Sequence, residues 1–273
     1  MNKYQLIASD LDGTLFGSDG RISEENMQAI EDLHRRGVYF VPASGRAFEE
    51  MPSVLREHPL IRYYITSDGG TVYDKETDRV LSLALSQEVS RRVLDKLYEY
   101  PVNMMLHADN RSYVDADLHN DADYIRCNYS EHWRRFVYKM DVPVPDFKNF
   151  AYGQKAVELF CVFFEHPEDL EECKAYFSKM PEVLCAQSDR CNLEIFATEA
   201  GKGNALLHLA RELGVPQAQT LAMGDSTNDM TMVLAAGLGL AVENAMPELQ
   251  AAADRVIVHH DHHALRYVTE NLI

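Results

Sequence analysis

The chain has 273 residues and a mass of 31.1 kDa, a length that suggests about two domains. An apolar fraction of 46% and a charged fraction of 25% are typical of a globular protein and exclude a disordered or collagen-like chain. The formal net charge of −17 repels phosphate backbones and anionic membranes, so neither nucleic acid nor a membrane is an expected partner.

The cysteines and the N-terminus point to a cytoplasmic protein. Five cysteines are an odd number and show no CxxC spacing, which argues against a disulfide framework and against a zinc site. The first residues have no signal-peptide pattern, and no apolar stretch approaches the ~20 residues that span a bilayer.

Six short apolar runs predict strands. Because the runs are continuous rather than alternating, the strands are expected to be covered on both faces, as in a parallel sheet. The first four runs each end in a polar or glycine-rich turn, which reads DLDGT, SGR, SDGG and GDSTND in chain order. The runs cover residues 4–9, 38–43, 63–66, 220–223, 237–242 and 255–258.

Helices are predicted between these strands. Ser23 is a helix N-cap and Gly37 ends the same helix, while a second helix over residues 202–213 stops before Gly214 and Pro216. Strand, helix and strand at this spacing predict right-handed βαβ units and an α/β fold.

The middle of the chain differs in composition and pattern, because it contains the single tryptophan Trp133, clustered tyrosines and no comparable turn motif. It contains a predicted strand at 156–164 and a predicted helix at 167–180, and the aromatic residues at 152–164 are expected to form a local core. We therefore predict a discontinuous core over residues 1–82 and 190–273 and an inserted second domain over residues 83–189.

Four carboxylates gather at the predicted edge of the sheet. Ligands of α/β sheets bind at the carboxyl ends of the strands, where Asp10 and Asp12 follow the first strand and Asp225 and Asp229 follow the fourth. Residues i and i+2 that leave a strand project to the same side, so Asp10 and Asp12 would repel each other without a cation or a shared proton. A small set of hard oxygen ligands with room for water and phosphate predicts a Mg²⁺ site.

Such a site can transfer a phosphoryl group. One aspartate can attack phosphorus and form an aspartyl-phosphate, and a neighbouring carboxyl can protonate the leaving oxygen and later activate water. Hydrogen-bond donors for the phosphate oxygens could come from Ser44, the backbone of Gly45 and Arg46, Lys202 and Asn228.

These residues resemble the haloacid dehalogenase superfamily, in the Cof-type branch that carries an α/β cap between its second and third motifs. The resemblance covers nearly the whole chain and implies a Rossmann-like core with a parallel sheet and an inserted α/β cap that controls substrate access. The four matching segments are DLDGTL at residues 10–15, SGR at 44–46, GKG at 201–203 and GDSTND at 224–229.

The resemblance also implies residue roles. Asp10 would be the nucleophile and Asp12 the general acid and base, and the presence of Asp12 favours phosphate over haloacid chemistry. Mg²⁺ would be held by Asp10, the backbone carbonyl of Asp12 and Asp225, with Asp229 supporting the metal's waters. The transferring phosphate would be held by Ser44, Gly45, Lys202 and Asn228.

Three segments depart from the family pattern, and the last of them, Asp261-His262-His263, stands where a more acidic, glycine-containing turn is common. The third turn reads Ser67-Asp68-Gly69-Gly70 where the family usually has Asn-Gly, and Gly201 precedes the lysine where the family usually has serine. Four histidines in residues 259–263 could suggest a metal site, but a solvated turn is favoured because adjacent residues of one loop give poor ligand geometry.

We therefore predict a Mg²⁺-dependent phosphatase that acts on small phosphorylated metabolites, with sugar phosphates favoured, through an aspartyl-phosphate intermediate. One alternative is a phosphomutase or phosphotransferase on the same scaffold. Another is a phospho-switch module in which Asp10 accepts phosphate without turnover.

Overall fold

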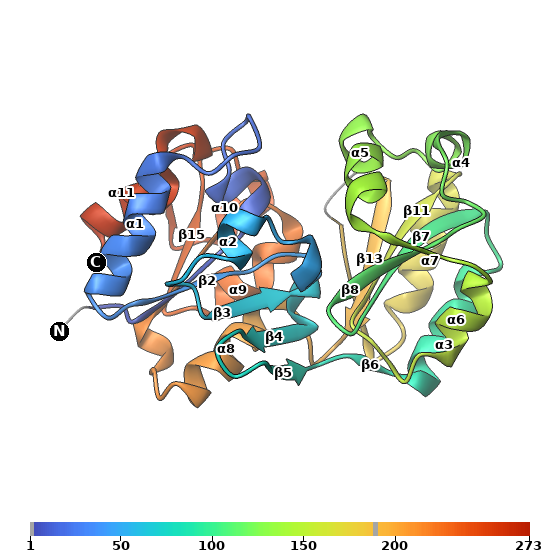
Figure 1. Cartoon of the computed structure of the whole chain (residues 1–273), viewed down its shortest axis with the longest axis horizontal. Helices are drawn as coiled ribbons and strands as arrows, with labels where there is room; N and C mark the ends of the chain where they lie inside the picture. Colours follow the sequence, from blue (N-terminus) through green and yellow to red (C-terminus); the bar gives the residue numbers. More distant parts are fainter. Residues whose placement is uncertain (1–2, 188–190) are drawn as a thin grey trace. The chain divides into compact units, whose positions relative to one another are not determined.

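The structure is a computed structural model that describes residues 3–187 and 191–273. It divides into two compact units. The first comprises Met1–Gly45, Pro52–Leu81 and Gly201–Ile273, and the second comprises Arg46–Met51 and Ser82–Ala200. In Figure 1 the first unit combines the blue and the orange-red parts of the chain, and the second contains the green and yellow middle.

Five parallel strands form the main sheet of the first unit, in the order β16-β15-β14-β1-β2. All residues of the three central strands are buried, as expected for a sheet covered on both faces. Each strand lies within or overlaps a predicted apolar run, which confirms the parallel α/β core. The strands are β1 (Leu6–Ser9), β2 (Tyr39–Pro42), β14 (Thr220–Gly224), β15 (Leu238–Ala241) and β16 (Arg255–Val256).

The two helices predicted for the first unit begin where the sequence indicates. The Ser23 hydroxyl accepts a hydrogen bond from the Asn26 backbone N–H at 3.2 Å, and α1 begins at the next residue. Helix α1 packs against α11, and α8 packs against α9. The bounds are α1 (Glu24–Arg35), α2 (Ser53–Arg56), α8 (Lys202–Glu212), α9 (Met230–Ala235), α10 (Pro247–Ala252) and α11 (Ala264–Asn271).

One predicted strand has a different arrangement from the others. Strand β3 (Tyr63–Thr66) pairs antiparallel with β4 (Thr71–Asp74), and β5 (Arg79–Ser82) completes a three-stranded sheet. A single parallel bridge between Ala43 and Ile65 joins β3 to the end of β2. This bridge brings the turn after β3 beside the turn after β2.

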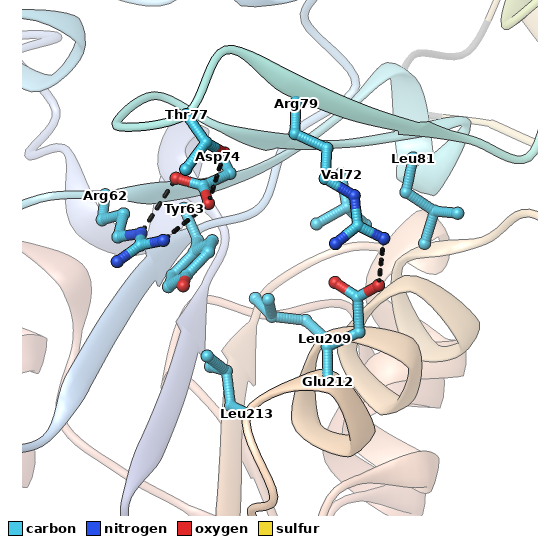
Figure 2. Close-up of a pocket in the computed structure, with 10 residues that line it drawn as sticks. All are labelled: Arg62, Tyr63, Val72, Asp74, Thr77, Arg79, Leu81, Leu209, Glu212 and Leu213. Atoms are coloured by element: carbon cyan, nitrogen blue, oxygen red, sulfur yellow. Dashed lines mark hydrogen bonds and ion pairs between the residues drawn. The ribbon is translucent and has the colours of Figure 1, made fainter.

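A cavity of about 400 Å³ lies between this small sheet and α8 (Figure 2). Its two arginines are both paired, Arg62 with Asp74 at 2.8 Å and Arg79 with Glu212 at 2.7 Å. The cavity is therefore lined by paired charges together with the less polar side chains of Tyr63, Val72, Leu81, Leu209 and Leu213.

The second unit is built on a mixed six-stranded sheet in the order β12-β13-β11-β7-β8-β9. Its strands pair antiparallel except for β8 and β9, which are parallel. All residues of the central strand β11 are buried. The bounds are β7 (Val102–Ala108), β8 (Arg111–Asp115), β9 (Val142–Val144), β11 (Leu159–Phe164), β12 (Val183–Ala186) and β13 (Asn192–Ala197).

The predicted strand 156–164 divides into two strands. Residues Ala156–Val157 form β10 and pair with β6 (Leu85–Ser86), whereas β11 joins the large sheet. The division falls at Glu158, whose backbone N–H donates to the His107 carbonyl at 2.8 Å and whose side chain accepts from the Asn110 N–H at 3.1 Å.

Among the described residues of the second unit, five α-helices accompany the sheet, and the core contains aromatic side chains as predicted. Helix α7 packs against β11, β12 and β13, and α3 packs against α6. Phe160, Phe163 and Phe177 are fully buried in this core. The bounds are α3 (Gln87–Leu97), α4 (Asp121–Arg126), α5 (Glu131–Met140), α6 (Phe147–Gly153) and α7 (Pro167–Phe177).

The edges of the two units can be compared with the predicted domain boundaries. The long segment of the second unit begins at Ser82, next to the predicted boundary at 82/83, while the other boundary at 189/190 lies outside the described residues. Because β13 pairs with β11 and β12, the chain up to Ala200 belongs with the second unit.

The short segment Arg46–Met51 also belongs to the second unit. Glu50 is 2% exposed, accepts a hydrogen bond from the Ala47 N–H at 2.6 Å, and lies 3.6 Å from the ring of His107. Burial raises the pKa of Asp141 well above its usual range, and the Glu50 carboxyl beside it adds to the effect. The segment is therefore anchored through a buried pair of acidic groups.

Within residues 3–187 and 191–273, no helix combines the length and the apolar character needed to cross a membrane.

Candidate active site

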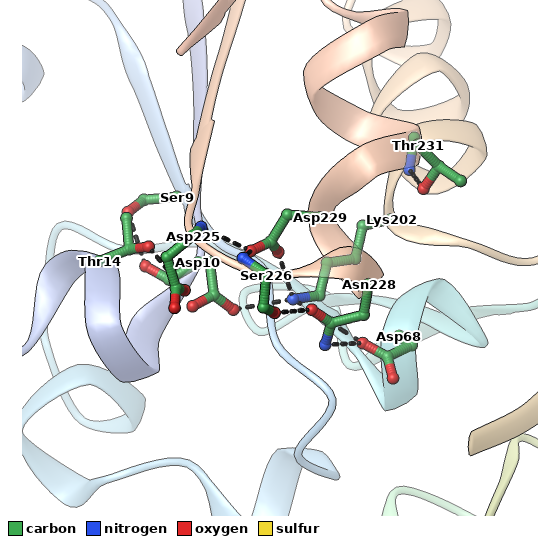
Figure 3. Close-up of polar contacts among 11 residues, drawn as sticks. Ser9, Asp10, Thr14, Asp68, Lys202, Asp225, Ser226, Asn228, Asp229 and Thr231 are labelled. Atoms are coloured by element: carbon green, nitrogen blue, oxygen red, sulfur yellow. Dashed lines mark hydrogen bonds and ion pairs between the residues drawn. The ribbon is translucent and has the colours of Figure 1, made fainter. Parts of the chain in front are cut away.

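The predicted acidic site forms at the carboxyl ends of β1 and β14 (Figure 3). These strands are parallel neighbours, with Ser9 opposite Met223, and the Asp10 N–H donates to the Met223 carbonyl at 3.0 Å. Asp10 therefore lies beside the turn that begins at Gly224 and carries Asp225. Asp10 is 6% exposed.

The turn after Asp10 depends on a glycine. Gly13 has a φ of +82°, and a Cβ at this position would lie 2.5 Å from Oδ2 of Asp225. The next residue, Thr14, donates its hydroxyl hydrogen to Oδ1 of Asp225 at 3.1 Å. The DLDGT motif thus packs directly against the GDSTND motif.

Asp12 has a different environment from Asp10. The strand ends at Ser9 and the chain turns directly after it. The expectation that Asp10 and Asp12 project to the same side, as residues i and i+2 of a strand do, therefore does not apply. Asp10 is buried, whereas Asp12 is exposed. An exposed carboxyl next to a buried one can exchange protons with a bound ligand or with water.

Lys202 is the central cation of the site. It is the first residue of α8 and has no exposed surface. Its ammonium donates to Oδ1 of Asp10 and to Oδ1 of Asp229, each at 2.7 Å. A buried ammonium with two carboxylate partners satisfies the rule that buried charges are paired.

Asp229 shapes the fourth turn. Its Oδ2 accepts hydrogen bonds from the backbone N–H groups of Asp225 at 2.9 Å and Ser226 at 3.1 Å, while its Oδ1 accepts from Lys202. Both oxygens are engaged by protein donors. Asp229 therefore holds the turn and the lysine in position.

The electrostatics of the cluster call for a further cation. Burial raises the pKa of Asp10 well above its usual range, Asp229 adds to this, and Lys202 opposes it. Burial and Asp229 likewise raise the pKa of Asp225 to about 7. For Lys202 burial lowers the pKa, but Asp10 and Asp229 outweigh it and hold the pKa well above its usual value. The Lys202 ammonium is thus bonded to Asp10 and Asp229, and it also opposes the rise in the Asp225 pKa.

The residues present fit a magnesium ion. One oxygen from each of Asp10, Asp225 and Asp229 lies within 4.8 Å of the others, and hard oxygen donors of this kind suit Mg²⁺. Since both oxygens of Asp229 are already engaged, Asp10 and Asp225 are the side chains best able to hold the ion directly. The Asp12 carboxyl lies outside this group of three.

The residues predicted to hold phosphate all lie in the first unit. Ser44 follows β2 and is buried, and its N–H donates to the Ile65 carbonyl at 3.0 Å. Gly45 lies against the carboxylate of Asp68, with Oδ2 of Asp68 3.2 Å from the place a Cβ would occupy. Asn228 is half-buried and donates from Nδ2 to Oδ1 of Asp68 at 3.0 Å.

Asp68 was not among the predicted site residues. It is 1% exposed, and its Oδ1 lies 3.7 Å from the Lys202 ammonium. Its position on a strand-end turn was visible in the sequence, but the SDGG turn differs from the Asn-Gly pattern and gave no role. An acidic residue on a strand-end turn, in line with the other motif turns, is the sequence feature from which Asp68 could have been predicted as a site residue.

A second cluster of possible metal ligands lies in the histidine-rich turn. Atoms of His259, His260 and Asp261 come within 4.8 Å of one another. Each has a local partner: Nδ1 of His259 accepts from the Asp261 N–H at 3.3 Å, the Asp261 carboxylate accepts from the N–H and hydroxyl of Ser18, both at 2.7 Å, and Nδ1 of His260 bonds the Phe16 carbonyl. These bonds explain the cluster as an anchor for the loop after the first motif, at a partly exposed turn.

Along most of its length the chain is similar to known proteins. A family model described as haloacid dehalogenase-like hydrolase matches residues 7–268. The chain is 30% identical to an HMP-PP phosphatase of Cronobacter sakazakii (strain ATCC BAA-894), over 90% of this chain and 87% of the relative. It is 27% identical to the 5-amino-6-(5-phospho-D-ribitylamino)uracil phosphatase YwtE of Bacillus subtilis (strain 168), over 98% of each.

A solved structure shares the fold. The sugar phosphatase BT4131, of haloacid dehalogenase subclass IIB, superimposes with a TM-score of 0.82 at 20% identity, over 97% of this chain and 98% of that chain.

Proposed function

Since the chain belongs to the haloacid dehalogenase-like hydrolases and is a phosphatase of small phosphorylated metabolites, we propose that it hydrolyses sugar phosphates and related polyhydroxy phosphate monoesters through an aspartyl-phosphate on Asp10. The observation that carries this proposal is the buried Asp10 carboxyl, bonded at 2.7 Å to a lysine that has no exposed surface.

The substrate class is supported by chemistry shared among the relatives. YwtE acts on a phosphorylated ribityl chain, and BT4131 is a sugar phosphatase. Another relative is an HMP-PP phosphatase, so a panel of substrates is needed to rank the classes.

In the first step, an oxygen of the Asp10 carboxylate attacks phosphorus and forms an O–P bond while the ester P–O bond breaks. The electron pair of that bond passes to the leaving oxygen, which takes a proton from Asp12 and departs as an alcohol. Lys202 holds Asp10 in position, and with Ser44, Gly45 and Asn228 it would bind the phosphate oxygens.

In the second step, Asp12 takes a proton from water, and the water oxygen attacks phosphorus. The bond to Asp10 breaks, and inorganic phosphate and the free carboxylate result. The exposed position of Asp12 suits a group that must exchange protons with both alcohol and water. Bound Mg²⁺, held by Asp10, Asp225 and the Asp12 carbonyl, would supply positive charge that lets a carboxylate approach the anionic phosphate.

We also propose that the second compact unit is a cap that controls substrate access. It contains residues 83–189, which the sequence predicts as the inserted domain. A domain inserted between the second and third motifs can select among leaving groups while the core motifs perform the same chemistry.

The test is phosphate release from a panel of phosphorylated metabolites, with and without Mg²⁺. Asp10→Asn is expected to abolish turnover while the folded state is retained, and Glu31→Gln on the exposed face of α1 serves as a charge-matched control. Near-normal activity of Asp10→Asn would remove Asp10 as the nucleophile. Phosphorylated sugar as the main product would indicate a phosphotransferase, and a stable phosphoenzyme without phosphate release would indicate a switch.

A further inference from the structure

Asp68 occupies a strained and tightly enclosed position. It follows β3 with a φ of +50°, in the left-handed region that aspartate enters more readily than most residues. Its N–H donates to the Ser44 carbonyl at 3.1 Å. On the other side, a Cβ on the next residue, Gly69, would lie 2.7 Å from the backbone nitrogen of Lys202. The turn is therefore fixed between the second and third motifs.

The Asp68 side chain faces the groups assigned to phosphate (Figure 3). Oδ1 accepts a hydrogen bond from Nδ2 of Asn228 at 3.0 Å and lies 3.7 Å from Nζ of Lys202. Oδ2 is buried and has no hydrogen-bond partner among the residues that the structure describes. A buried carboxyl oxygen without a hydrogen-bond donor lowers the stability of the folded state. A role in stabilising the fold therefore does not explain why Asp68 is here.

The charge at this place opposes an anionic ligand. Lys202 already balances Asp10 and Asp229, and Asp68 adds a third carboxyl within 4 Å of the same ammonium. In the proposed reaction the phosphate would use the Lys202 ammonium and the Asn228 amide hydrogens, which are the groups that Asp68 contacts. Asp68 and phosphate therefore compete for the same two donors, and two negative groups in one buried site repel each other.

We propose that Asp68 weakens the binding of inorganic phosphate and so promotes release of the product. The inference rests on the proposed function, because that proposal assigns Lys202 and Asn228 to the phosphate. Asp68 acts through these two residues and is a positioning residue rather than a catalytic one.

The test is Asp68→Asn, which keeps the shape and the left-handed backbone and removes the charge. Calorimetric titration of the Mg²⁺-loaded protein with inorganic phosphate should show roughly tenfold tighter binding than wild type. The inhibition constant of phosphate should fall by a similar factor, and KM should fall with it. The Glu31→Gln control should leave phosphate binding unchanged.

A second variant separates charge from hydrogen bonding. Asp68→Gly fits the left-handed backbone and brings no new donor, so tighter phosphate binding in this variant would show that loss of the carboxylate, and not an added amide donor, is the cause. Unchanged or weaker phosphate binding in both variants would overturn the proposal.

The binding measurement also separates this inference from the proposed reaction. Tighter phosphate binding by Asp68→Asn, with no ester hydrolysed by the wild type, would leave Asp68's role intact and overturn the reaction. Ester hydrolysis by the wild type with no change in phosphate binding would do the reverse.

Discussion

Both compact units bury acidic side chains, but they surround them differently. In the first unit, Asp10 and Asp229 each bond to the Lys202 ammonium at 2.7 Å, and Asp225 completes an oxygen cluster that fits a divalent cation. In the second unit, Glu50 and Asp141 lie together at 2% and 8% exposure. In the first arrangement the Lys202 ammonium opposes the rise in the Asp10 pKa, whereas in the second the Glu50 carboxyl adds to the rise in the Asp141 pKa. Burial alone therefore does not identify a reactive carboxyl group.

The largest expected effect comes from removing the buried Lys202 ammonium, which is bonded to Asp10 and Asp229 in the first unit. Lys202→Met leaves Asp10 and Asp229 buried without their partner, which costs about 3–5 kcal/mol of stability. Activity should fall by at least about a thousandfold, because the proposed nucleophile loses its position.

Chemical denaturation and phosphate-release assays measure the two losses. Arg211→Gln, on the exposed face of the same helix, is the control and should change neither. Full activity in Lys202→Met would contradict the role of this lysine.

Magnesium should stabilise the first unit through the same cluster. At a concentration a hundred times its Kd, a ligand that binds only the folded protein adds about 2.7 kcal/mol. This gain should be absent from Asp225→Asn, and a chelator should remove it from the wild type. Thermal unfolding with and without Mg²⁺ measures the difference.

Asp261→Asn provides the matched control, because Asp261 belongs to the other group of possible ligands. It should retain the full Mg²⁺ effect. If Asp261→Asn and not Asp225→Asn loses the effect, the ion binds at the histidine-rich turn instead.

The stability contributed by the acidic pair of the second unit, Glu50 and Asp141, should change with pH in the opposite direction from that of a salt-bridged carboxylate. The Asp141 pKa lies well above its ordinary value of 3.8, so the folded protein keeps a proton that the unfolded chain has released. Stability from this group is therefore complete below about pH 4 and decreases as the pH rises toward the folded pKa. Asp141→Asn should remove the decrease and stabilise the protein at pH 8 by about 1–3 kcal/mol.

Denaturation of the wild type and Asp141→Asn at pH 5 and pH 8 tests this. Asp117→Asn, an exposed aspartate of the same unit, should show the wild-type pH dependence. A loss of stability in Asp141→Asn at both pH values would mean that the carboxyl group makes contacts that the amide cannot replace.

The same contrast explains how far the sequence could predict the molecule. The parallel sheet and its acidic edge were predictable because apolar runs mark buried strands and turns mark their carboxyl ends. Once β1 and β14 are neighbours, Asp10 must lie beside the turn that carries Asp225. These features depend on local pattern and on one general rule of α/β topology.

Contacts between distant segments could not be predicted in this way. The sequence gives no signal that Glu50 belongs to the second unit, because its contact with His107 joins residues far apart in the chain. The same is true of Asp68, whose approach to Asn228 depends on how β3 bridges to the end of β2. The break at Glu158 likewise depends on a long-range bond to the His107 carbonyl.

The smallest expected effect concerns charges that are paired but exposed. Arg79 and Glu212 flank the cavity of the first unit with side-chain exposures of 65% and 41%. Because water solvates both partners, a double-mutant cycle of Arg79→Ala and Glu212→Ala should give a coupling free energy of about 0.5 kcal/mol or less. Phosphate release should be unchanged in all three variants, since the cavity contains none of the proposed catalytic residues. A loss of activity in Arg79→Ala alone would instead connect this cavity to the reaction, and would show that an exposed ion pair can matter as much here as the buried cluster around Lys202.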